Sequence, residues 1–455
     1  MGKTISALNE LDGIFGRWSI PNEEKEIQGI LKYDDNTVNM ITSESFNNDF
    51  FDDEEHPIIN GFLADGNEIT LWGAIRSNYS VSFPGLPRFV FSPTYIFLGK
   101  QYEKEDIKLK QISAIFDGFS RWIGEKCFFT NDWDGNKKEL TMSYRTPVFD
   151  RVKCGNKEIG IRCEARAHSD SFSSYSLDQK MWVTISYDSE VVWTEAYSDL
   201  YDYAEFLTLC MGTKCVPGLI RAKDVDGVDI AIFENTKQEI TKLKKRFLVE
   251  YADIKDNYGE ILNNWYLKQE EISPVISYFV DAHSAERIVK SIPRFLRMAQ
   301  ALESFSRKLR QSTLVSPEEH QKKIENVISQ IASEEDKKWL EDILSTPVIN
   351  EPSCQQRITS LLNEIPYEAL NIKKKKLRSL SYKIVVTRNY YTHFNDSLKD
   401  KILDSRELLY ASTFMKYVLR MLLGKELGID MDKMVNRMRT DSEFGTAVNE
   451  LNLLN

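Results

Sequence analysis

The sequence lacks the marks of a membrane or secreted protein. No apolar run in its 455 residues approaches the ~20 residues that a membrane-spanning helix needs. The N-terminus, where Glu10 and Asp12 lie early, lacks the basic and then apolar segments of a signal peptide. We therefore expect a cytoplasmic protein without a membrane partner.

Cysteine and histidine are scarce, and neither is arranged as a metal site. The six cysteines form no C-x-x-C pair, so the usual spacings of zinc and redox sites are absent and buried free thiols are expected. Residues 132–136 resemble the start of a calcium loop, but the glycine is fourth rather than sixth and no glutamate stands twelfth, which favours a β-turn. The G-x-x-x-x-G-K-[ST], G-x-G-x-x-G and H-E-x-x-H motifs are also missing. We therefore predict no metal and no cofactor.

The chain is acidic overall, but its two halves differ in charge. The formal net charge is −10, which argues against a general nucleic-acid coat. Residues 1–236 contain 24 Lys and Arg against 38 Asp and Glu, whereas residues 237–455 contain 35 against 31. The halves therefore carry net charges of −14 and +4, which indicates two parts with different partners.

The first part, residues 1–236, has the pattern of a β-rich domain. Short alternating or apolar runs recur between turn signals, and six of the eight tryptophans lie here, which suits a sheet core or a binding face. Many short strands at this spacing favour a sandwich or barrel-like fold. Segment 44–55, rich in Asp and Glu, is expected to be an acidic loop. The predicted strands are 27–33, 37–41, 58–63, 68–75, 79–83, 88–98, 108–116, 140–144, 158–166, 181–187 and 191–194, with a helix at 201–211 and a hairpin strand at 228–233.

The second part, residues 237–455, has the 3.6-residue period of helices. Pro317 before two glutamates is typical of a first helical turn, and Ser333 before three acidic residues is typical of an N-cap. Together the two parts predict an α+β multidomain protein with an N-terminal β-rich domain and a C-terminal all-α helical bundle. The predicted helices are 238–258, 276–309 with an interruption near Pro293, those that begin at Pro317 and Ser333, 367–394 and 399–427, followed by a short C-terminal piece.

The helix predicted at 367–394 carries an arginine, an amide and a histidine in close succession. Arg388 can bind phosphate in a planar fork, and His393 can exchange protons near neutral pH. Asn389 and His393 are i, i+4 and share a helix face. Arg388 and His393 are five residues apart, about 140° around an ideal helix, so one undistorted helix does not aim both at one phosphate. A two-fold dimer would bring two copies of the motif together across its axis.

The flank of this motif is basic. Residues 366–394 carry a net charge of +6 within an acidic protein, which attracts phosphate, and Tyr390 and Tyr391 could stack on bases. A solvated helix face is the alternative interpretation. The bare spacing is weak evidence, since Arg162 and His168 nearly reproduce it in a strand-like run. The candidate RNA-binding residues are Lys373, Lys374, Lys375, Lys376 and Arg378.

The Arg388–His393 pattern resembles that of the HEPN superfamily, whose all-helical domains form a ribonuclease site from an R-x4-6-H motif, often at a dimer interface. Arg388 and His393 match the two motif positions, and Asn389 matches the polar residue usual after the arginine. The segment Gly13-x-Phe15-Gly16-Arg17-Trp18 with Pro21, the segment Gly29-x-Leu31-x-Tyr33, and the helix around Ala301-Leu302-Glu303 are similar to the ApeA-like group of bacterial anti-phage defence proteins. The resemblance implies a regulatory or sensing domain at 1–236 and a HEPN ribonuclease domain at 237–455.

These residues and the resemblance lead to one functional hypothesis. We expect a metal-independent endoribonuclease of the abortive-infection type, in which the RNA 2′-hydroxyl attacks the adjacent phosphate and leaves a 2′,3′-cyclic phosphate and a 5′-hydroxyl. His393 would move the proton and Arg388 would neutralise the phosphoryl charge. Asn389 would orient His393 or the phosphate, and Glu303 is a candidate supporting partner.

The implied partners are RNA, with transfer RNA as a candidate by analogy with other HEPN nucleases, a second copy of the chain, and a phage-derived trigger sensed by the β-rich domain. The alternative is a non-catalytic interaction protein. Its helical domain would dimerise or bind RNA, and its β-rich domain would capture a protein or glycan ligand on a tryptophan-rich face.

Overall fold

The chain forms two compact units. The computed structural model describes residues 5–47, 54–130, 140–170, 172–236, 243–283, 291–310 and 313–453. One unit comprises Met1–Leu207 and Cys215–Leu243, and the other comprises Thr208–Lys214 and Lys244–Asn455. The first unit holds the β-strands and the second holds most of the helices, which confirms the predicted α+β class. Within these ranges, no helix combines the length and the apolar character that crossing a membrane requires.

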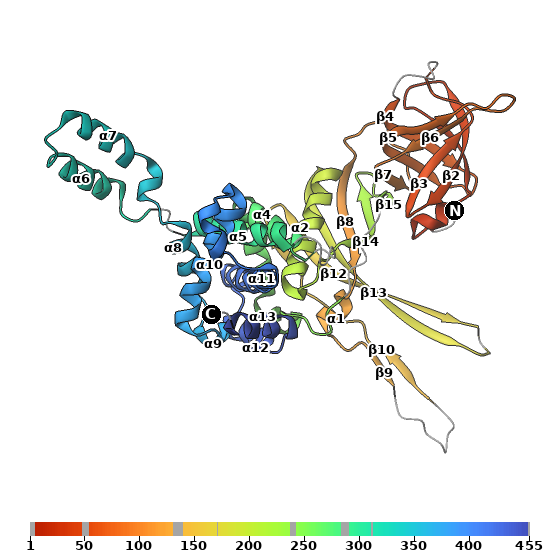
Figure 1. Cartoon of the computed structure of the whole chain (residues 1–455). Helices are drawn as coiled ribbons and strands as arrows, with labels where there is room; N and C mark the ends of the chain where they lie inside the picture. The colour runs from red at the N-terminus through yellow and green to blue at the C-terminus, as the bar shows by residue number, and fades with distance from the viewer. Residues whose placement is uncertain are drawn as a thin grey trace. The chain divides into compact units, whose positions relative to one another are not determined.

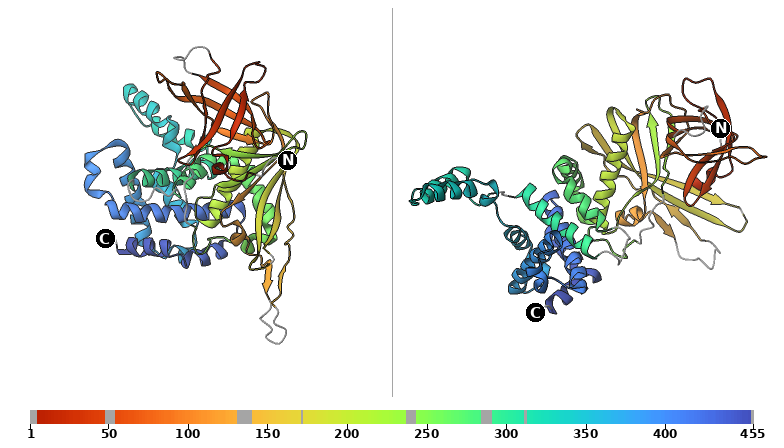
Figure 2. Two further views of the ribbon diagram at one scale, coloured as in Figure 1. Left: turned by 90° about the vertical axis from the view of Figure 1, so that its right-hand side faces the viewer. Right: turned by 45° about the horizontal axis from the view of Figure 1, so that its top comes forward.

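Six antiparallel strands of the first unit close into a barrel. They are β1 (Phe15–Ser19), β2 (Glu26–Asp34), β3 (Thr37–Thr42), β4 (Glu55–Leu63), β5 (Glu68–Ser80) and β6 (Arg88–Ser92). The strand order is β5-β4-β1-β2-β3-β6, and β6 pairs with β5 to complete the ring (Figure 1 and Figure 2). The fully buried Trp18 fills its interior, and a Cβ at Gly61 would overlap the indole ring. The barrel therefore needs glycine at position 61.

The same sheet continues beyond the barrel as an antiparallel extension. Its strands are β7 (Tyr95–Leu98), β8 (Lys108–Phe116), β11 (Val152–Cys154), β12 (Lys157–Ser169), β13 (Tyr175–Val192), β14 (Pro217–Asp224) and β15 (Asp229–Glu234). After β5 they follow in the order β7-β15-β14-β8-β13-β12-β11. Helix α2 (Trp193–Met211) covers one face, where Tyr203 contacts Phe116 and Trp193 contacts Phe97. The unit also contains α1 (Phe119–Ile123) and the two-stranded ladder of β9 (Phe128–Thr130) and β10 (Met142–Tyr144).

Most predicted strands are confirmed, and the differences lie at turns. The runs 27–33, 37–41, 58–63, 108–116 and 158–166 all lie within strands. The runs 68–75 and 79–83 were predicted as separate strands, but β5 runs unbroken to Ser80 and then ends. The run 88–98 is instead divided at Pro93, which cannot donate to a ladder. The run 181–187 and the first two residues of the run 191–194 belong to the single strand β13. Helix α2 begins at Trp193, earlier than the predicted helix start at 201.

The tryptophans belong to the core. Of the two interpretations of these tryptophans, a sheet core and a binding face, the structure supports the core for those that it describes in this part. Trp72, the most exposed of them, still packs its ring against another indole at 5.1 Å. Trp133 and the β-turn predicted at 132–136 lie outside the described residues. The remaining described tryptophans of this part are at most 2% exposed: Trp18, Trp122, Trp182 and Trp193.

The acidic segment 44–55 is a loop in its described residues 44–47 and 54, but one of its carboxylates is buried. Residues 48–53 lie outside the described residues, but Glu54 is 2% exposed. Its carboxylate binds Arg76 Nη1 at 2.8 Å and His56 Nε2 at 2.8 Å, and it accepts a hydrogen bond from Ser45. The loop prediction is thus confirmed for residues 44–47 and 54, which lie outside helices and strands, but the charge of Glu54 is neutralised by buried partners.

All six cysteines are free thiols, and four of them are buried, as the sequence indicates. Burial raises the pKa of Cys154 and of Cys163 to about 11. Over the described ranges, no three His, Cys, Asp or Glu side chains are grouped closely enough to hold a metal ion.

The second unit is a helical bundle around one buried helix, α11 (Ser405–Leu427). A capping box between Asp404 and Glu407 begins α11, and Gly428 in the left-handed conformation ends it. Helix α11 packs against α4 (Tyr258–Asp281), α5 (Ser291–Leu309), α12 (Met431–Arg439) and α13 (Ser442–Leu453). The other helices are α3 (Tyr251–Ile254), α6 (Pro317–Ile328), α7 (Glu334–Leu344), α8 (Cys354–Asn363), α9 (Tyr367–Leu370) and α10 (Lys374–His393).

Two of the predicted helix starts are confirmed. Pro317 stands in the first turn of α6, and Ser333 caps α7 by accepting a hydrogen bond from the Asp336 backbone. The predicted interruption near Pro293 is also confirmed. Helix α4 ends at Asp281, and α5 begins at Ser291 with Pro293 in its first turn, where the missing N–H of proline is not needed.

Other helix boundaries also differ from the prediction. The segment 238–258 is not a continuous helix: residues 237–242 lie outside the described residues, residues 243–250 are not helical, and α3 covers only four residues. The helix at 367–394 is divided into α9 and α10 because Asn371 adopts a left-handed conformation with φ of 49°. The helix at 399–427 begins only at Ser405, after a 3-10 segment.

Candidate functional site

Three helices of the second unit bring the main candidate residues together. Helix α5 supplies Glu303, α8 begins with Cys354, and α10 supplies Arg388 and Asn389. These helices pack against one another. Thr387 Oγ1 accepts a hydrogen bond of 2.9 Å from the Leu403 backbone, which fixes the chain that follows α10. The site is therefore built on rigid elements.

Two neighbours hold the guanidinium of Arg388. Its Nη2 lies 3.1 Å from Glu303 Oε2, and its Nη1 donates to Asn389 Oδ1 at 3.0 Å. The side chains of Arg388 and Glu303 are 25% and 14% exposed, so the pair is mostly buried but a ligand in solvent can still reach it. A guanidinium has more N–H donors than the two used here, and the remaining donors can bind a phosphate.

Glu303 belongs to a wider charge network. Arg307, one helical turn later, lies 3.2 Å from Glu303 and also binds Glu351, which in turn lies 3.0 Å from Arg357. Burial alone would lower the pKa of Arg307, but the two carboxylates outweigh it and raise that pKa. The hydrogen bond from Arg307 lowers the pKa of Glu351. With Arg388, the network holds three guanidinium groups against two carboxylates, an excess of positive charge.

Cys354 supports the network as a neutral donor. Its Sγ lies 3.7 Å from Glu303 Oε2. Burial, together with the charge of Glu303, raises the pKa of Cys354 to about 11. The thiol is therefore protonated at neutral pH and is not a nucleophile.

His393 is the last residue of α10, and its side chain is exposed. Phe394 ends the helix in a left-handed conformation with φ of 49°, and its ring lies 6.2 Å from that of Tyr390, which contacts Tyr391 at 5.1 Å. In the part of the chain that the structure describes, His393 has no hydrogen-bond or ion-pair partner. Its imidazole is thus available to a ligand or to a second copy of the chain.

Asn389 lies on the same face of α10 as one motif residue and is hydrogen-bonded to the other. It shares a helix face with His393, four residues on, yet its oxygen accepts from Arg388. Arg388 and His393 remain about 140° apart around the helix axis. Within one chain the structure gathers Arg388, Asn389 and Glu303, and leaves His393 at the helix end.

The lysine run lies at the opposite end of α10. Lys374 and Arg388 are separated by 14 residues of helix, about 21 Å at the helical rise. Lys373, Lys374, Lys375 and Arg378 are exposed, whereas Lys376 reaches the backbone oxygen of Asn452. The structure therefore does not bring the predicted RNA-binding residues to the arginine–histidine motif.

Sequence reasoning missed Arg307, Glu351 and Cys354. Arg307 had one local signal, because it is i, i+4 from Glu303. Glu351 and Cys354 lie about fifty residues further along the chain and had none, since only the packing of α8 against α5 brings them near.

A closed β-barrel with a sheet extension, joined to a helical bundle that carries Arg388, Asn389 and His393, defines a HEPN-domain protein with an N-terminal β domain. Residues 296–433 match the family model Apea-like HEPN, and residues 13–265 match ApeA N-terminal domain 1. The second match covers more than half of the chain, so the chain belongs to the ApeA family. The HEPN match supports an RNA-related, nuclease-type role in defence.

Other comparisons add little. No curated protein matches the chain. A solved structure described as "MrkH, A novel c-di-GMP dependence transcription regulatory factor" is similar at 10% identity over 40% of this chain and 80% of that chain. Its TM-score is 0.15, so it supports no argument about fold or ligand.

Proposed function

We propose that this chain is a HEPN-type endoribonuclease that cleaves RNA without a metal ion. One observation carries the proposal: a guanidinium held by Glu303 and Asn389 lies on the helix that ends in the exposed His393, inside the Apea-like HEPN match. Such a preoriented cation can stabilise the charge that develops on a reacting phosphate.

The proposed reaction is an internal transfer of the phosphoryl group. The 2′-oxygen forms a bond to phosphorus while the bond to the 5′-oxygen breaks, which leaves a 2′,3′-cyclic phosphate and a 5′-hydroxyl. His393 takes the proton from the 2′-hydroxyl or gives one to the leaving oxygen. Arg388 binds the non-bridging oxygens. Because the two side chains diverge on one helix, the proposal includes a dimer in which one protomer's Arg388 faces its partner's histidine.

The direct test compares Arg388→Ala and His393→Ala with wild type. Each variant should lower RNA cleavage at least about a hundredfold, because each removes transition-state stabilisation or proton transfer. Cleavage of total RNA is followed on gels, product ends are tested for cyclic phosphate, and toxicity is measured in cells. Arg88→Ala and His168→Ala, two exposed residues of the first unit, are the matched controls.

The chemistry has its own control. An RNA with a single 2′-deoxy nucleotide at the cleaved position should resist cleavage, because the attacking hydroxyl is absent. Wild-type protein should remain active in EDTA. If either alanine variant cleaves at the wild-type rate in EDTA, the assignment to Arg388 and His393 is wrong.

Transfer RNA is the substrate class we propose to examine first, and a phage-derived trigger sensed by the first unit is the proposed activator. The second candidate function is a non-catalytic RNA-binding protein in the same defence role. It is favoured by the separation of the exposed lysine run from Arg388. Retention of RNA without cleavage, with trigger-expressing cell extract added, would support this second function.

A further inference from the structure

The sheet extension of the first unit has one polar face, opposite the face that α2 covers. Strand register places Ser113 of β8 directly between Thr184 of β13 and Arg221 of β14, so the three side chains share that face. The Ser113 and Thr184 hydroxyls lie 3.0 Å apart, and Gln111 donates to Ser113 at 3.4 Å. Hydroxyl and amide groups in the middle of a sheet mark a surface that is not built for packing.

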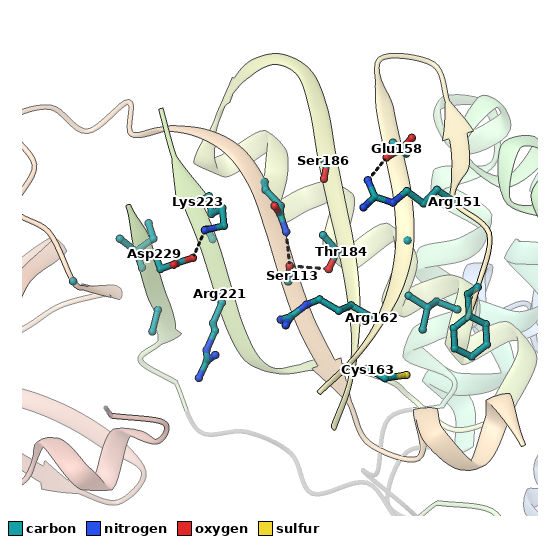
Figure 3. A pocket seen from close by; sticks show the side chains of 18 of the residues that line it. Ser113, Arg151, Glu158, Arg162, Cys163, Thr184, Ser186, Arg221, Lys223 and Asp229 are labelled. Carbon is teal, nitrogen blue, oxygen red and sulfur yellow. Dashed lines mark hydrogen bonds and ion pairs between the residues drawn. The ribbon is translucent and has the colours of Figure 1, made fainter. Parts of the chain in front are cut away.

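This face forms the floor of a cavity of about 1080 Å³ (Figure 3). Its two flanks carry ion pairs, between Arg151 and Glu158 at 2.7 Å and between Lys223 and Asp229 at 2.8 Å. A volume of this order accommodates a ligand larger than a simple ion.

Two guanidinium groups in the centre of the cavity form no such ion pair with any residue that the structure describes. Arg162 extends from β12 toward Arg221 of β14 (Figure 3). Both guanidiniums lie over the indole of the buried Trp182, at 5.5 and 5.0 Å from its ring centre. Among the described residues, neither arginine has a carboxylate within ion-pair distance. Glu164, on which the charge of Arg221 also acts through space, is engaged by Arg166 at 2.6 Å and by Trp182 Nε1 at 3.0 Å.

The cavity is therefore electropositive within the acidic half of the chain. Its lining contains five cationic and two acidic residues, whereas residues 1–236 carry a net charge of −14. Two converging guanidiniums beside hydroxyl donors match the geometry of phosphate oxygens, which accept paired N–H bonds. We propose that this cavity binds a phosphate-bearing small molecule of nucleotide size, with Arg162 and Arg221 on the phosphates and the Ser113–Thr184 floor beneath them.

The test measures binding of ATP to the full-length protein by calorimetry, in a protein that also carries Arg388→Ala so that the candidate nuclease site contributes nothing. Arg162→Gln and Arg221→Gln should each weaken ATP binding about tenfold or more, because each removes a charged, paired donor. Arg162→Lys and Arg221→Lys should weaken it less, since they keep the charge and lose the fork. Arg88→Gln, an exposed arginine of the barrel, should bind ATP as the parent does.

Competition identifies the part of the ligand that is recognised. Pyrophosphate should displace ATP, and adenosine, which lacks phosphate, should not. The melting temperature without ligand shows whether each variant is folded. If a glutamine variant does not fold, ATP binding by the corresponding lysine variant tests the same arginine. The proposal is overturned if ATP does not bind at millimolar concentration, if Arg88→Gln weakens binding equally, or if a short RNA binds through Arg162 and Arg221 while ATP and pyrophosphate do not.

Discussion

At the residue scale, the candidate nuclease site depends on the contact between Glu303 and Arg388. The carboxylate does not reach substrate in the proposed mechanism, so it is a positioning residue that holds the guanidinium. Glu303→Ala should lower the cleavage rate about tenfold or more, the value of a hydrogen bond to a charged group, while RNA affinity changes less. Glu303→Asp should restore part of the rate.

Single-turnover rates and RNA affinity, measured separately, check this prediction. Glu319→Ala, which breaks an exposed i, i+4 ion pair with Lys323, is the matched control and should have no effect on either quantity. A Glu303→Ala protein with the wild-type cleavage rate and an unchanged melting temperature would show that Arg388 does not need the contact with Glu303 for cleavage.

A second prediction concerns Glu54 inside the barrel and the pH dependence of stability. Burial alone would raise the pKa of Glu54, but hydrogen bonds from His56, Ser45 and the Asn47 backbone outweigh it and lower the pKa below its usual 4.5. The unfolded chain therefore takes up this proton first as the pH falls. The stabilisation by the carboxylate is full above pH 4.5 and is lost as the pH falls through the lower, folded-state pKa.

Glu54→Gln should accordingly flatten the loss of stability below pH 4.5. It should also destabilise the protein at neutral pH by about 3–5 kcal/mol, because the buried Arg76 loses the carboxylate that lies 2.8 Å from its Nη1. Thermal unfolding between acidic and neutral pH tests both effects. Glu55→Gln, the exposed neighbour, should leave the curve unchanged, and a Glu54→Gln curve that is parallel to wild type at all pH values would contradict the assignment.

At the scale of elements, α10 begins unfavourably for a helix. Lys373 occupies the N-cap position without a side-chain hydrogen bond, and lysines follow it, at the end where the helix dipole favours negative charge. Lys373→Ser should therefore stabilise the protein by about 1 kcal/mol. If the run binds RNA phosphates, the same change should weaken RNA binding and reduce the slope of affinity against salt by about 0.7 for each phosphate that the variant no longer neutralises.

Urea unfolding and filter binding at several salt concentrations measure the two effects. Lys376→Ser is a useful contrast, because that side chain is engaged by the Asn452 backbone. A Lys373→Ser protein with higher stability and unchanged RNA binding would mean that the run is only a solvated helix face.

Some helices and strands could be predicted from the sequence because neighbouring residues alone determine them. Pro317 and Ser333 mark helix starts because capping is decided by neighbouring residues. Strands β2 and β3 could be recognised because buried positions alternate with more exposed ones along most of their length. The unbroken β5 and β13, and the division between α9 and α10, depend on distant ladder partners or on one left-handed residue. Helical period alone did not distinguish segment 243–250 from a helix.

The candidate site likewise has residues that the sequence predicted and contacts that it did not. Arg388, Asn389 and His393 are close in sequence and were predicted together, and Glu303 came from the family resemblance. The contacts of Glu303 with Cys354, and of Arg307 with Glu351, follow from packing between helices that are about fifty residues apart and carry no local pattern. The central arginines of the cavity, Arg162 and Arg221, were equally hidden, because only strand register places them on one face.

At the scale of the whole molecule, the divergence of Arg388 and His393 on α10 predicts a site shared between two copies. Co-expression of Arg388→Ala and His393→Ala chains should then recover activity that neither variant has alone. Random pairing makes half of the dimers mixed, each with one intact site of two, so about a quarter of wild-type activity is expected. Cleavage assays on differently tagged, co-purified chains test this, and a mixture as inactive as the single variants would contradict a shared site.

The sheet that closes at one end has a consequence for how copies of this chain can meet. Closure of the barrel removes one edge of the thirteen-stranded sheet, and β11 covers only residues 157–159 of β12 on the other. The rest of β12 carries Arg162, Glu164, Arg166 and His168 at every second position. Such a row of ionisable side chains opposes edge-to-edge strand addition. Arg162 and His168, which imitate the nuclease spacing, thus lie where side chains oppose the addition of a strand from a second copy.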